Sequence, residues 1–577
     1  MQQEKDWRNK TWMKLDQPWD IIVVGGGITG AGIFREAVRL GLKTLLVEQR
    51  DFAWGTSSRS SKLVHGGLRY LKEGRFMLTR HSVLERQRLL EEGPGLIDPL
   101  GFLLVTYKGE SPGRWSYSAG LSVYDLLALQ WSHEHYSAED FQMLAPHIAR
   151  EGLKGGFRYG DAQTDDARLV MRVISEAAAD GGTALNYVAA EKVLLENGRV
   201  TGVRLRDKEI NRSVEIRARV VINAAGAWAD RLRGQVGGQP RIRPLRGSHL
   251  VFPHWRLPVA QAVTFVHPID GRLLFIFPWE GITIVGTTDL DHDKPLMEEP
   301  AVSAEETAYL MAAVEAQFPS LDLNLNDVIS SFSGVRPVIG SGKADPSKES
   351  RDHVVWEENG LLTVTGGKMT TFRLIALDAL SAVRHRFPHL PPLDDSVPVL
   401  DPVDVDLPGA GNLPESARRR LLGRYAACAR DLVSAAKPEE MKLIPGTQTL
   451  WAELRWAARA ESVVHLDDLL LRRVRIGLFL PGGGADILPQ IRALSQPELG
   501  WDDARWDKEE AAYLELWKRC YSLPDAGSVP DWKAMLVEAR SRKQAKKKSF
   551  RRRLVRSFAA GVLISLSLSL LYLSRKK

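Results

Sequence analysis

The sequence predicts an α/β protein with a mainly helical domain on its C-terminal side. A short apolar run at residues 20–24 leads into a glycine-rich turn, a helical pattern up to residue 40 and a second apolar run at 44–48, which is the order strand, helix, strand. Short β-rich runs then alternate with helical stretches as far as residue 317. After residue 408 the strand signals fade, so a separate helical domain is expected.

Local residue patterns place the individual elements. Runs of β-branched and large apolar residues predict strands at 202–205, 220–222, 273–277 and 282–285. Helical periodicity predicts helices at 304–317, 415–436, 451–460, 466–476 and 508–521. Residues 391–408 are rich in proline and aspartate and are expected to form a linker.

The glycine-rich turn has the GxGxxG pattern, between a strand and a helix, of a Rossmann-type dinucleotide-binding domain; it comprises Gly25, Gly26, Gly27, Ile28, Thr29 and Gly30. Its glycines permit the tight turn, the close approach of a pyrophosphate and the packing of the helix on the strand. Glu48 ends the second strand, where a carboxylate binds ribose hydroxyls and repels a 2′-phosphate, which favours FAD or NAD over NADP. A glycine-rich turn without a ligand is the alternative.

A second GxGxxG motif is absent from the sequence. One dinucleotide that reacts directly with the substrate is therefore expected, rather than electron transfer between two nucleotides. Residues 55–62 and 65–70 are rich in serine and glycine, which suits a pyrophosphate and a flavin edge, although such a loop is more often only a connection.

Composition excludes several classes of protein. The 577 residues are 44% hydrophobic and 26% charged, as in a globular protein and unlike a disordered or polytopic membrane chain. Two cysteines, Cys428 and Cys520, allow no CxxC pair, zinc cluster or disulfide framework and suit a reducing compartment. The first 19 residues lack a signal-peptide pattern, and no metal-ligand spacing is present, so no metal site is expected.

The net charge of +7 is concentrated in one segment. Residues 540–577 contain 13 Lys or Arg and no Asp or Glu, so the other 539 residues carry a charge of −6, which argues against nucleic-acid binding.

Within this segment, residues 557–574 form an uncharged run of 18, and as a helix of about 27 Å it nearly matches a hydrocarbon core of about 30 Å. A single spanning helix is predicted, with an interfacial helix or a free tail as alternatives. The basic residues before the run predict that the rest of the chain lies on the cytoplasmic face of the cell membrane.

Residues 55–70, together with 24–32, resemble the FAD-dependent glycerol-3-phosphate dehydrogenases of the D-amino-acid-oxidase-like flavoprotein superfamily. The resemblance spans about residues 20–380 and returns in the helical region near 465–470 and 501–506. Other similar segments are 164–169, 223–228, 247–249, 286–289, 333–337 and 366–373. The sequence departs from the family pattern at Phe34, Glu36, Leu40, Ala225, Ala227 and Phe372, which weakens the subfamily assignment more than the cofactor assignment.

The resemblance implies a Rossmann-type FAD-binding domain with an inserted antiparallel-sheet substrate domain, a C-terminal helical domain and a hydrophobic tail. The expected divisions are an N-terminal extension at 1–18, a discontinuous oxidoreductase region at 19–390, the linker at 391–408, the helical domain at 409–530, and the basic stretch and membrane anchor at 540–577. Non-covalent FAD is the implied cofactor. Its implied binding residues are Gly25, Gly26, Gly27, Ile28, Thr29, Gly30, Glu48, Gln49, Thr56, Ser57, Ser61, Gly67, Leu68, Ala225, Gly226, Gly367, Lys368, Met369 and Thr370.

The resemblance also implies oxidation of sn-glycerol 3-phosphate to dihydroxyacetone phosphate. Its implied catalytic residues are His249, Arg336, Arg69 and Lys368, and Tyr70 joins these four in binding the substrate. Cationic side chains hold the phosphate, and the histidine is a base or a hydrogen-bond donor. Taken alone, each cation could be a surface residue and the histidine a core residue, while Asp165, Asp166 and Asp289 could simply support structure.

Membrane quinone is the expected electron acceptor, because the predicted anchor places the enzyme where quinone resides. A glycerol-3-phosphate oxidase that reduces oxygen to peroxide is the close alternative. A non-catalytic flavin-binding membrane protein is a remote one. The expected partners are therefore the substrate, quinone and the lipid bilayer, with a possible homo-oligomer and no nucleic acid.

Overall fold

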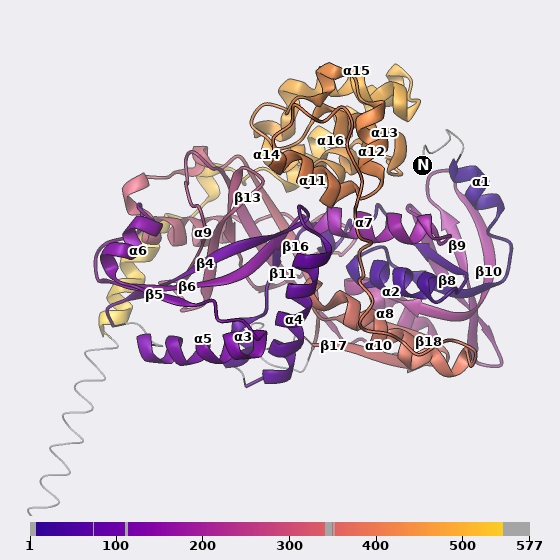
Figure 1. Cartoon of the computed structure of the whole chain (residues 1–577), viewed down its shortest axis with the longest axis horizontal. Coiled ribbons are helices and arrows are strands. Elements are labelled where there is room, and N and C mark those ends of the chain that lie inside the picture. The colour runs from indigo at the N-terminus through magenta and orange to yellow at the C-terminus, as the bar shows by residue number, and fades with distance from the viewer. Residues whose placement is uncertain (1–6, 73, 110–112, 341–348, 350–351, 546–577) are drawn as a thin grey trace, which may run out of the picture.

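The computed structural model describes residues 7–72, 74–109, 113–340, 349 and 352–545 (Figure 1). It contains two sheets side by side and a helical domain across one end of them. The predicted hydrophobic segment at 557–574 lies outside the described residues. In the described part of the chain, no helix is both long enough and apolar enough to cross a bilayer.

The first sheet has a parallel core in the order β18-β10-β1-β2-β7. Its strands are β1 (Trp19–Val24), β2 (Thr44–Val47), β7 (Thr183–Leu185), β10 (Arg212–Asn223) and β18 (Leu361–Gly366). The antiparallel strands β8 (Val188–Glu196), β9 (Arg199–Asp207) and β17 (His353–Glu358) extend it. Because β1 is buried on both faces, its sequence is a continuous apolar run rather than an alternating one.

Helices α2 (Ile28–Arg39), α7 (Asp166–Ala179) and α10 (Phe372–Val383) pack together over the parallel sheet. Gly32 of α2 allows this packing, since a Cβ there would lie 2.8 Å from the ring of Phe372. The strand, turn, helix and second strand expected near the N-terminus are confirmed by β1, α2 and β2. The order of the five parallel strands is that of a Rossmann-type domain.

The second sheet is mainly antiparallel, in the order β15-β11-β14-β13-β12-β4-β6-β3, with β16 paired to β11 and β5 to β6. Only the β4–β12 pair is parallel among the described strand pairs of this sheet. Its strands are β3 (Leu63–Val64), β4 (Ile97–Tyr107), β5 (Glu134–Tyr136), β6 (Leu153–Thr164), β11 (Ile242–Pro253), β12 (Ala262–Val266), β13 (Leu273–Trp279), β14 (Ile282–Gly286), β15 (Leu290–Asp291) and β16 (Ser330–Ile339). Groups of these strands alternate along the chain with those of the first sheet, which confirms that an antiparallel-sheet domain is inserted between segments of the Rossmann-type domain.

Other helices surround the two sheets (Figure 1). They are α1 (Trp7–Met13), α3 (Leu68–Lys72), α4 (Phe76–Glu92), α5 (Arg114–Ala128), α6 (Ala138–Leu144), α8 (Ala229–Arg233) and α9 (Ala304–Gln317). Helix α9 begins with a complete capping box, in which Ser303 and Glu306 satisfy each other's backbone N–H groups, and it occupies the predicted range.

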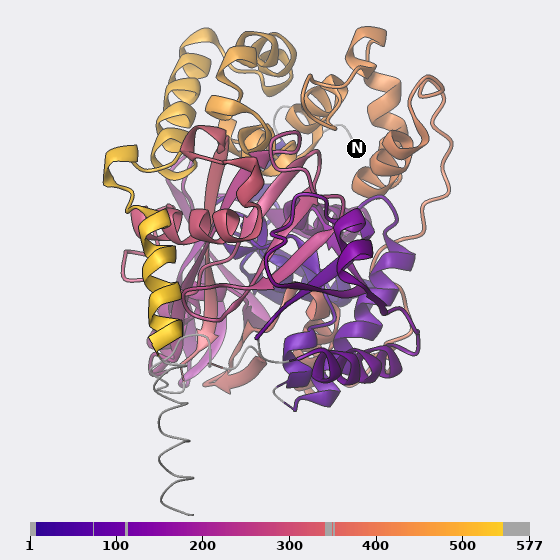
Figure 2. The same ribbon diagram turned by 90° about the vertical axis from the view of Figure 1, so that its left-hand side faces the viewer.

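The helical domain lies above both sheets in Figures 1 and 2. It contains α11 (Glu415–Tyr425), α12 (Cys428–Ala435), α13 (Trp451–Ala460), α14 (Ile476–Phe479), α15 (Leu488–Leu499), α16 (Asp503–Cys520) and a π-helical turn, η10 (Asp468–Arg473). Residues 391–408, which precede it, carry neither helix nor strand. After α16 the chain returns past the second sheet, where a helix at 532–545 packs near α9 through Trp532 (Figure 2).

Two expected helices have a different form. The single helix predicted at 415–436 is interrupted where Ala426 takes a φ of +48°, so α11 and α12 are separate. The helix predicted at 466–476 is instead the π-helical turn η10, followed by Arg475 with a φ of +62° and then α14. Apolar periodicity detects buried residues in both places but does not detect the changes in backbone direction.

A buried ion pair connects the helical domain to the first sheet's helices. Both guanidinium Nη atoms of Arg168, in α7, donate to the two carboxylate oxygens of Glu461 over 2.7 and 2.8 Å. Both side chains are almost fully buried, so the loss of one partner leaves the other charge without compensation.

We predict that Arg168→Met lowers the free energy of unfolding by about 3–5 kcal/mol, because Glu461 then stays buried without its partner. Urea denaturation followed by tryptophan fluorescence measures this effect. The control is Arg204→Met, which breaks a half-exposed pair with Glu215 and is expected to change stability by about 1 kcal/mol or less. Equal effects of the two substitutions would contradict the role of Arg168.

Candidate active site

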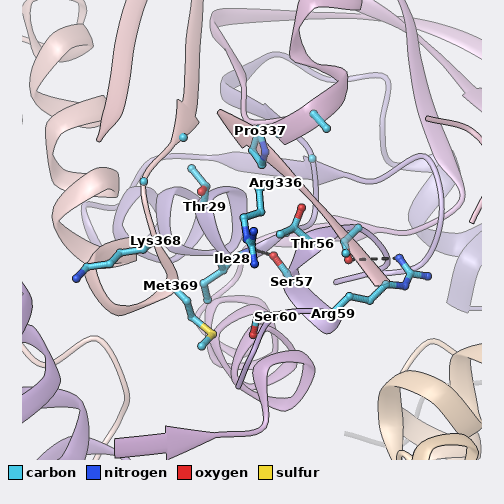
Figure 3. Close-up of a pocket in the computed structure, with 18 of the residues that line it drawn as sticks. Ile28, Thr29, Thr56, Ser57, Arg59, Ser60, Arg336, Pro337, Lys368 and Met369 are labelled. Atoms are coloured by element: carbon cyan, nitrogen blue, oxygen red, sulfur yellow. Dashed lines mark hydrogen bonds between the residues drawn. The ribbon is translucent and has the colours of Figure 1, made fainter. Parts of the chain in front are cut away.

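A cavity of about 340 Å³ lies between the two sheets (Figure 3). The carboxyl ends of β1, β10 and β18 form one side of it, and β11 and β16 contribute to the other. This is where open parallel sheets bind ligands. The sequence-predicted residues that line it are Gly25, Gly27, Ile28, Thr29, Glu48, Gln49, Thr56, Ser57, Ser61, Tyr70, Ala225, Gly226, Arg336, Gly367, Lys368, Met369 and Thr370.

The glycine turn leaves no room for side chains. Gly25 has a φ of +118°, and a Cβ there would lie 2.5 Å from the carbonyl oxygen of Ala224. A Cβ on Gly30 would lie 1.8 Å from the carbonyl oxygen of Gly25, so this glycine lets α2 pack against the turn. Gly27 faces the cavity, and its Cβ would lie 3.0 Å from Ser57 Oγ. Backbone is therefore what the turn presents to a ligand.

Glu48 supports the turn from the end of β2. Its Oε2 accepts the N–H of Gly26 over 2.7 Å, and its Oε1 accepts the N–H of Arg50 over 2.9 Å. Burial raises the pKa of this carboxyl group, while the two backbone donors oppose the rise. Glu48 thus fixes the turn as well as lining the cavity.

The loop at 51–62, which we call the cofactor loop, covers the turn. Ser57 Oγ accepts the N–H of Ile28 at the start of α2 over 2.9 Å. The guanidinium of Arg59 donates to the carbonyl of Trp54 and forms a buried ion pair with Glu299. Sequence reasoning identified the loop as rich in hydroxyl groups but missed Trp54 and Arg59 as lining residues, because Glu299, which both side chains contact, is distant in the chain.

Arg336 of β16 lines the second-sheet side of the cavity (Figure 3). Its Nη1 donates to Asp289 Oδ1 over 2.9 Å, and its Nη2 donates to Thr287 Oγ1 over 3.3 Å. A Cβ on Gly247 would lie 2.5 Å from Nη2, so a glycine there makes room for the guanidinium. Asp289, which could have been only structural, holds the predicted anion-binding arginine in place.

Lys368 contributes a second cation to the cavity. Its Nζ donates to the carbonyl oxygen of His65 over 3.3 Å and lies 4.7 Å from the ring centre of Tyr70. Burial lowers the pKa of this ammonium group to about 7, and the charge of Asp161 partly opposes that effect. The ammonium group is therefore charged below about pH 7 and becomes neutral above it.

His249 lies beside the cavity rather than in its lining. Its ring is fully buried, stacks on Phe332 with centroids 4.5 Å apart, and has Nε2 2.9 Å from the Oγ of Ser61, which does line the cavity. Burial lowers the pKa of the imidazole well below its usual range, and the charges of Arg336 and Lys62 lower it further. The imidazole is thus neutral at neutral pH, with a lone pair on one of its ring nitrogens.

Four further predicted residues stand next to the cavity without lining it. Gly26 and Gly30 shape the turn, and Leu68 packs against the core formed by the second sheet and the helical domain. Gly67, with a φ of +79°, makes space for Tyr70 and Lys368, since its Cβ would lie 2.3 Å from the tyrosine ring. Arg69 belongs to α3, but its side chain lies outside what the structure describes.

Comparison with known proteins identifies the family. Residues 20–373 match the family described as FAD dependent oxidoreductase, and residues 381–506 match the C-terminal domain of alpha-glycerophosphate oxidase. The chain is 36% identical over 481 residues to the aerobic glycerol-3-phosphate dehydrogenase of Staphylococcus aureus, covering 79% of this chain and 86% of that protein. The chain belongs to the FAD-dependent oxidoreductase family, in its glycerol-3-phosphate dehydrogenase and oxidase branch.

Solved structures of this family have the same fold. The glycerol-3-phosphate dehydrogenase of Bacillus halodurans, complexed with FAD, is 27% identical, with a TM-score of 0.71 over 89% of this chain and 98% of that one. The L-alpha-glycerophosphate oxidase of Mycoplasma pneumoniae, with FAD bound, gives a TM-score of 0.54 at 18% identity over 68% of this chain and 100% of that one, which shows the shared fold alone. The predicted family, the α/β fold with its C-terminal helical domain, and FAD as the cofactor are confirmed, while the hydrophobic tail stays a prediction.

The residues of the cavity fit the family's cofactor. The glycine turn offers bare backbone at the start of a helix, as a pyrophosphate requires. The indole Nε1 of Trp228, another lining residue that sequence reasoning missed, is buried with no hydrogen-bond partner among the described residues. Such an unsatisfied donor is costly unless a ligand accepts its hydrogen bond.

We predict that Gly27→Val purifies without flavin, because its side chain would fill the space in front of Ser57 where backbone must meet the pyrophosphate. Flavin absorbance per mole of protein is the measurement. Gly120→Val is the matched control, since a Cβ at Gly120 has nothing within 4 Å. Stoichiometric flavin in Gly27→Val would exclude the turn as the cofactor site.

Proposed function

We propose that this enzyme oxidises sn-glycerol 3-phosphate to dihydroxyacetone phosphate and passes the electrons to membrane quinone. The observation that carries the substrate assignment is the pair of cationic side chains, Arg336 and Lys368, in the same cavity as the glycine turn. A guanidinium forks onto phosphate oxygens, and an ammonium adds a point charge. The relatives named glycerol-3-phosphate dehydrogenase support the same substrate.

The glycine turn, Glu48 and the cofactor loop would hold FAD without a covalent bond, with residues 366–370 at another part of the cavity. When bound, this cofactor takes up the two electrons and one proton that leave the C2–H bond of the substrate as a hydride. The protein has to hold the phosphate, orient C2 and remove the remaining hydroxyl proton.

Arg336 is the proposed phosphate anchor. Asp289 and Thr287 hold the guanidinium from one side, which reduces the conformational freedom that would be lost on binding. Lys368 and Tyr70 stand together at another part of the cavity, where the ammonium group provides a second positive charge. Arg69 remains a predicted contributor from α3.

His249 is the proposed proton acceptor, acting through Ser61. As the C2–H bond breaks, the hydroxyl proton of the substrate passes to Ser61 Oγ while the Ser61 proton passes to His249 Nε2, and the C2–O bond becomes a carbonyl. This path follows from the 2.9 Å contact and from the position of Ser61 at the cavity surface. The substrate loses two electrons and two protons in total, which balances its conversion to the ketone.

Anaerobic addition of sn-glycerol 3-phosphate tests the substrate. We expect it to bleach the flavin absorbance of the purified protein, and an unchanged spectrum would favour the non-catalytic alternative. In Arg336→Ala, FAD should remain bound, but at least about tenfold more substrate should be needed for the same bleaching, because a charge-assisted contact contributes about 1.5–3 kcal/mol.

Arg243→Ala is the matched control for the Arg336 prediction. Arg243 lies on the neighbouring strand β11 and pairs with Asp291, outside the cavity lining. Its removal should leave the substrate requirement unchanged. Equal substrate requirements in Arg336→Ala and the unmodified enzyme would exclude Arg336 as the phosphate anchor.

The electron acceptor separates the dehydrogenase from an oxidase. Quinone is favoured by the predicted anchor at 557–574, while the match of residues 381–506 to a glycerophosphate oxidase domain favours oxygen. We predict that the enzyme in bilayers reduces a ubiquinone analogue at least about tenfold faster than it forms hydrogen peroxide in air. Peroxide formation at the rate of substrate oxidation would establish the oxidase instead.

We also propose attachment to the cytoplasmic face of the membrane through residues 540–577. A chain that ends at Ala539 should stay in solution and still reduce a water-soluble dye, because the cavity residues all precede this point. The full-length protein should remain with membranes in a high-salt wash, since an inserted apolar segment does not depend on charge. Release by salt alone would contradict a spanning helix.

A further inference from the structure

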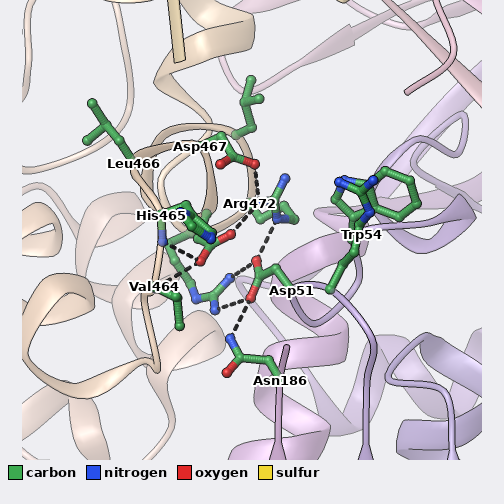
Figure 4. A network of polar contacts seen from close by, with 12 residues as sticks. Asp51, Trp54, Asn186, Val464, His465, Leu466, Asp467 and Arg472 are labelled. Atoms are coloured by element: carbon green, nitrogen blue, oxygen red, sulfur yellow. Dashed lines mark hydrogen bonds and ion pairs between the residues drawn. The ribbon is translucent and has the colours of Figure 1, made fainter. Parts of the chain in front are cut away.

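Three arginines of the helical domain contact the cofactor loop or its neighbours, although none of the three lines the cavity (Figure 4). Arg472 and Arg473 end the turn η10, and Arg475 follows it. All three are at most 1% exposed. Buried guanidinium groups require partners, and theirs include Asp51 and the carbonyl of Ser58 in the cofactor loop.

Asp51, at the first end of the loop, is held by two of these arginines. Arg473 Nη1 and Nη2 donate to its two oxygens over 2.7 and 2.8 Å, and Arg472 Nε donates over 2.5 Å. Asn186 donates to the same carboxylate over 3.1 Å. The guanidinium charges hold the pKa of Asp51 below its usual range despite its burial. The start of the loop is therefore fixed by a bidentate ion pair from the other domain.

The second end of the loop is held through Arg475 and Asp166. Arg475 Nη2 donates to the carbonyl of Ser58 over 3.1 Å and also contacts Asp166. The Asp166 carboxylate accepts the backbone N–H of Ser60 over 2.9 Å, its Oγ–H over 2.7 Å, and the ammonium of Lys62 over 2.9 Å. The guanidinium of Arg475 thus contacts both the backbone of the cofactor loop and the Asp166 carboxylate, which binds the loop near its second end.

The side-chain contacts of Arg475 accompany an unusual backbone conformation at this residue. Its φ of +62° lies in the left-handed region that favours glycine. The side chain also donates to Asp165 over 3.1 Å and to the carbonyl of Leu471 over 2.8 Å. These contacts stabilise a backbone conformation that an arginine would otherwise avoid.

Between these two anchored ends, the loop provides Trp54, Thr56, Ser57 and Ser60 to the cavity. We propose that Arg473 and Arg475 are positioning residues for FAD, which act through Asp51, Ser58 and Asp166 to hold the cofactor loop in its binding conformation. The proposal rests on the assigned FAD cavity and is independent of the substrate. If the contact between η10 and the loop strengthens FAD binding by some factor, then FAD binding stabilises that contact by the same factor. This reciprocity is a thermodynamic requirement of coupled equilibria.

Hydrogen–deuterium exchange on the full chain, with FAD removed and then restored, tests the coupling. We expect FAD to slow exchange of the amides at 468–475 by at least about fivefold, although these residues do not line the cavity. Helix α12, in the same domain, is the internal control and should not respond. Equal exchange at 468–475 with and without FAD would overturn the proposal.

Two variants test the reverse direction. Arg475→Lys keeps the positive charge but loses the several N–H donors of the guanidinium group. This variant should bind FAD at least about tenfold more weakly and show an altered flavin spectrum. Arg455→Lys is the matched control: Arg455 pairs with Glu440 and Glu498 within the helical domain, so FAD affinity should be unchanged even if the melting temperature falls. A folded Arg475→Lys protein with unchanged FAD affinity would also overturn the proposal, and if this variant does not fold, the exchange experiment decides alone.

The same measurements separate this proposal from the proposed function. If FAD slows exchange at 468–475 but sn-glycerol 3-phosphate fails to bleach the flavin, the positioning role stands and the substrate assignment fails. If bleaching occurs without any change in exchange, the substrate assignment stands and the positioning role fails.

Discussion

The carboxylate of Asp166 joins three parts of the molecule that are far apart in sequence. It lies at the start of α7, accepts hydrogen bonds from Ser60 and Lys62 of the cofactor loop, and meets Arg475 of the helical domain. Asp166 itself is fully buried, where an unpaired carboxylate would be prohibitively costly. Burial and the neighbouring Arg475 lower the pKa of Lys62 to about 8, whereas the charge of Asp166 opposes this fall. The positive charge of Lys62 therefore depends on this carboxylate. The cofactor loop, α7 and the helical domain are consequently held in one arrangement.

Burial in the cavity also determines which protonation states are available for chemistry. Burial beside the cavity keeps His249 neutral, and burial in its lining brings the pKa of Lys368 to about 7. A bound phosphate dianion would raise the lysine pKa, because an opposite charge favours the protonated form. Substrate binding and protonation of Lys368 are therefore linked. Asp289 accepts a hydrogen bond from Arg336 and so keeps this guanidinium oriented to bind the same anion.

Local sequence patterns were sufficient for several elements and for the cofactor motif. The turn at Gly25 and the buried run of β1 identified a dinucleotide-binding unit, since a glycine turn between strand and helix has few other uses. Helices α9 and α13 occupy the predicted ranges because their periodicity or capping is encoded within a few residues. The helix predicted at 415–436 was wrong as a single element, because the reversal at Ala426 follows from packing between α11 and α12. The membrane anchor at 557–574 stays a prediction.

Sequence alone therefore established the α/β class, the FAD family and just under half of the residues that line the cavity, since these belong to short motifs whose spacing reflects backbone geometry. Tertiary structure decided that Arg336 is held by Asp289, that His249 reaches the cavity only through Ser61, and that Arg475 braces the cofactor loop. Each of these contacts joins residues separated by tens to hundreds of positions. Local periodicity carries no information about such pairs, because their proximity arises only when the interleaved segments of the two sheets and the helical domain pack against one another.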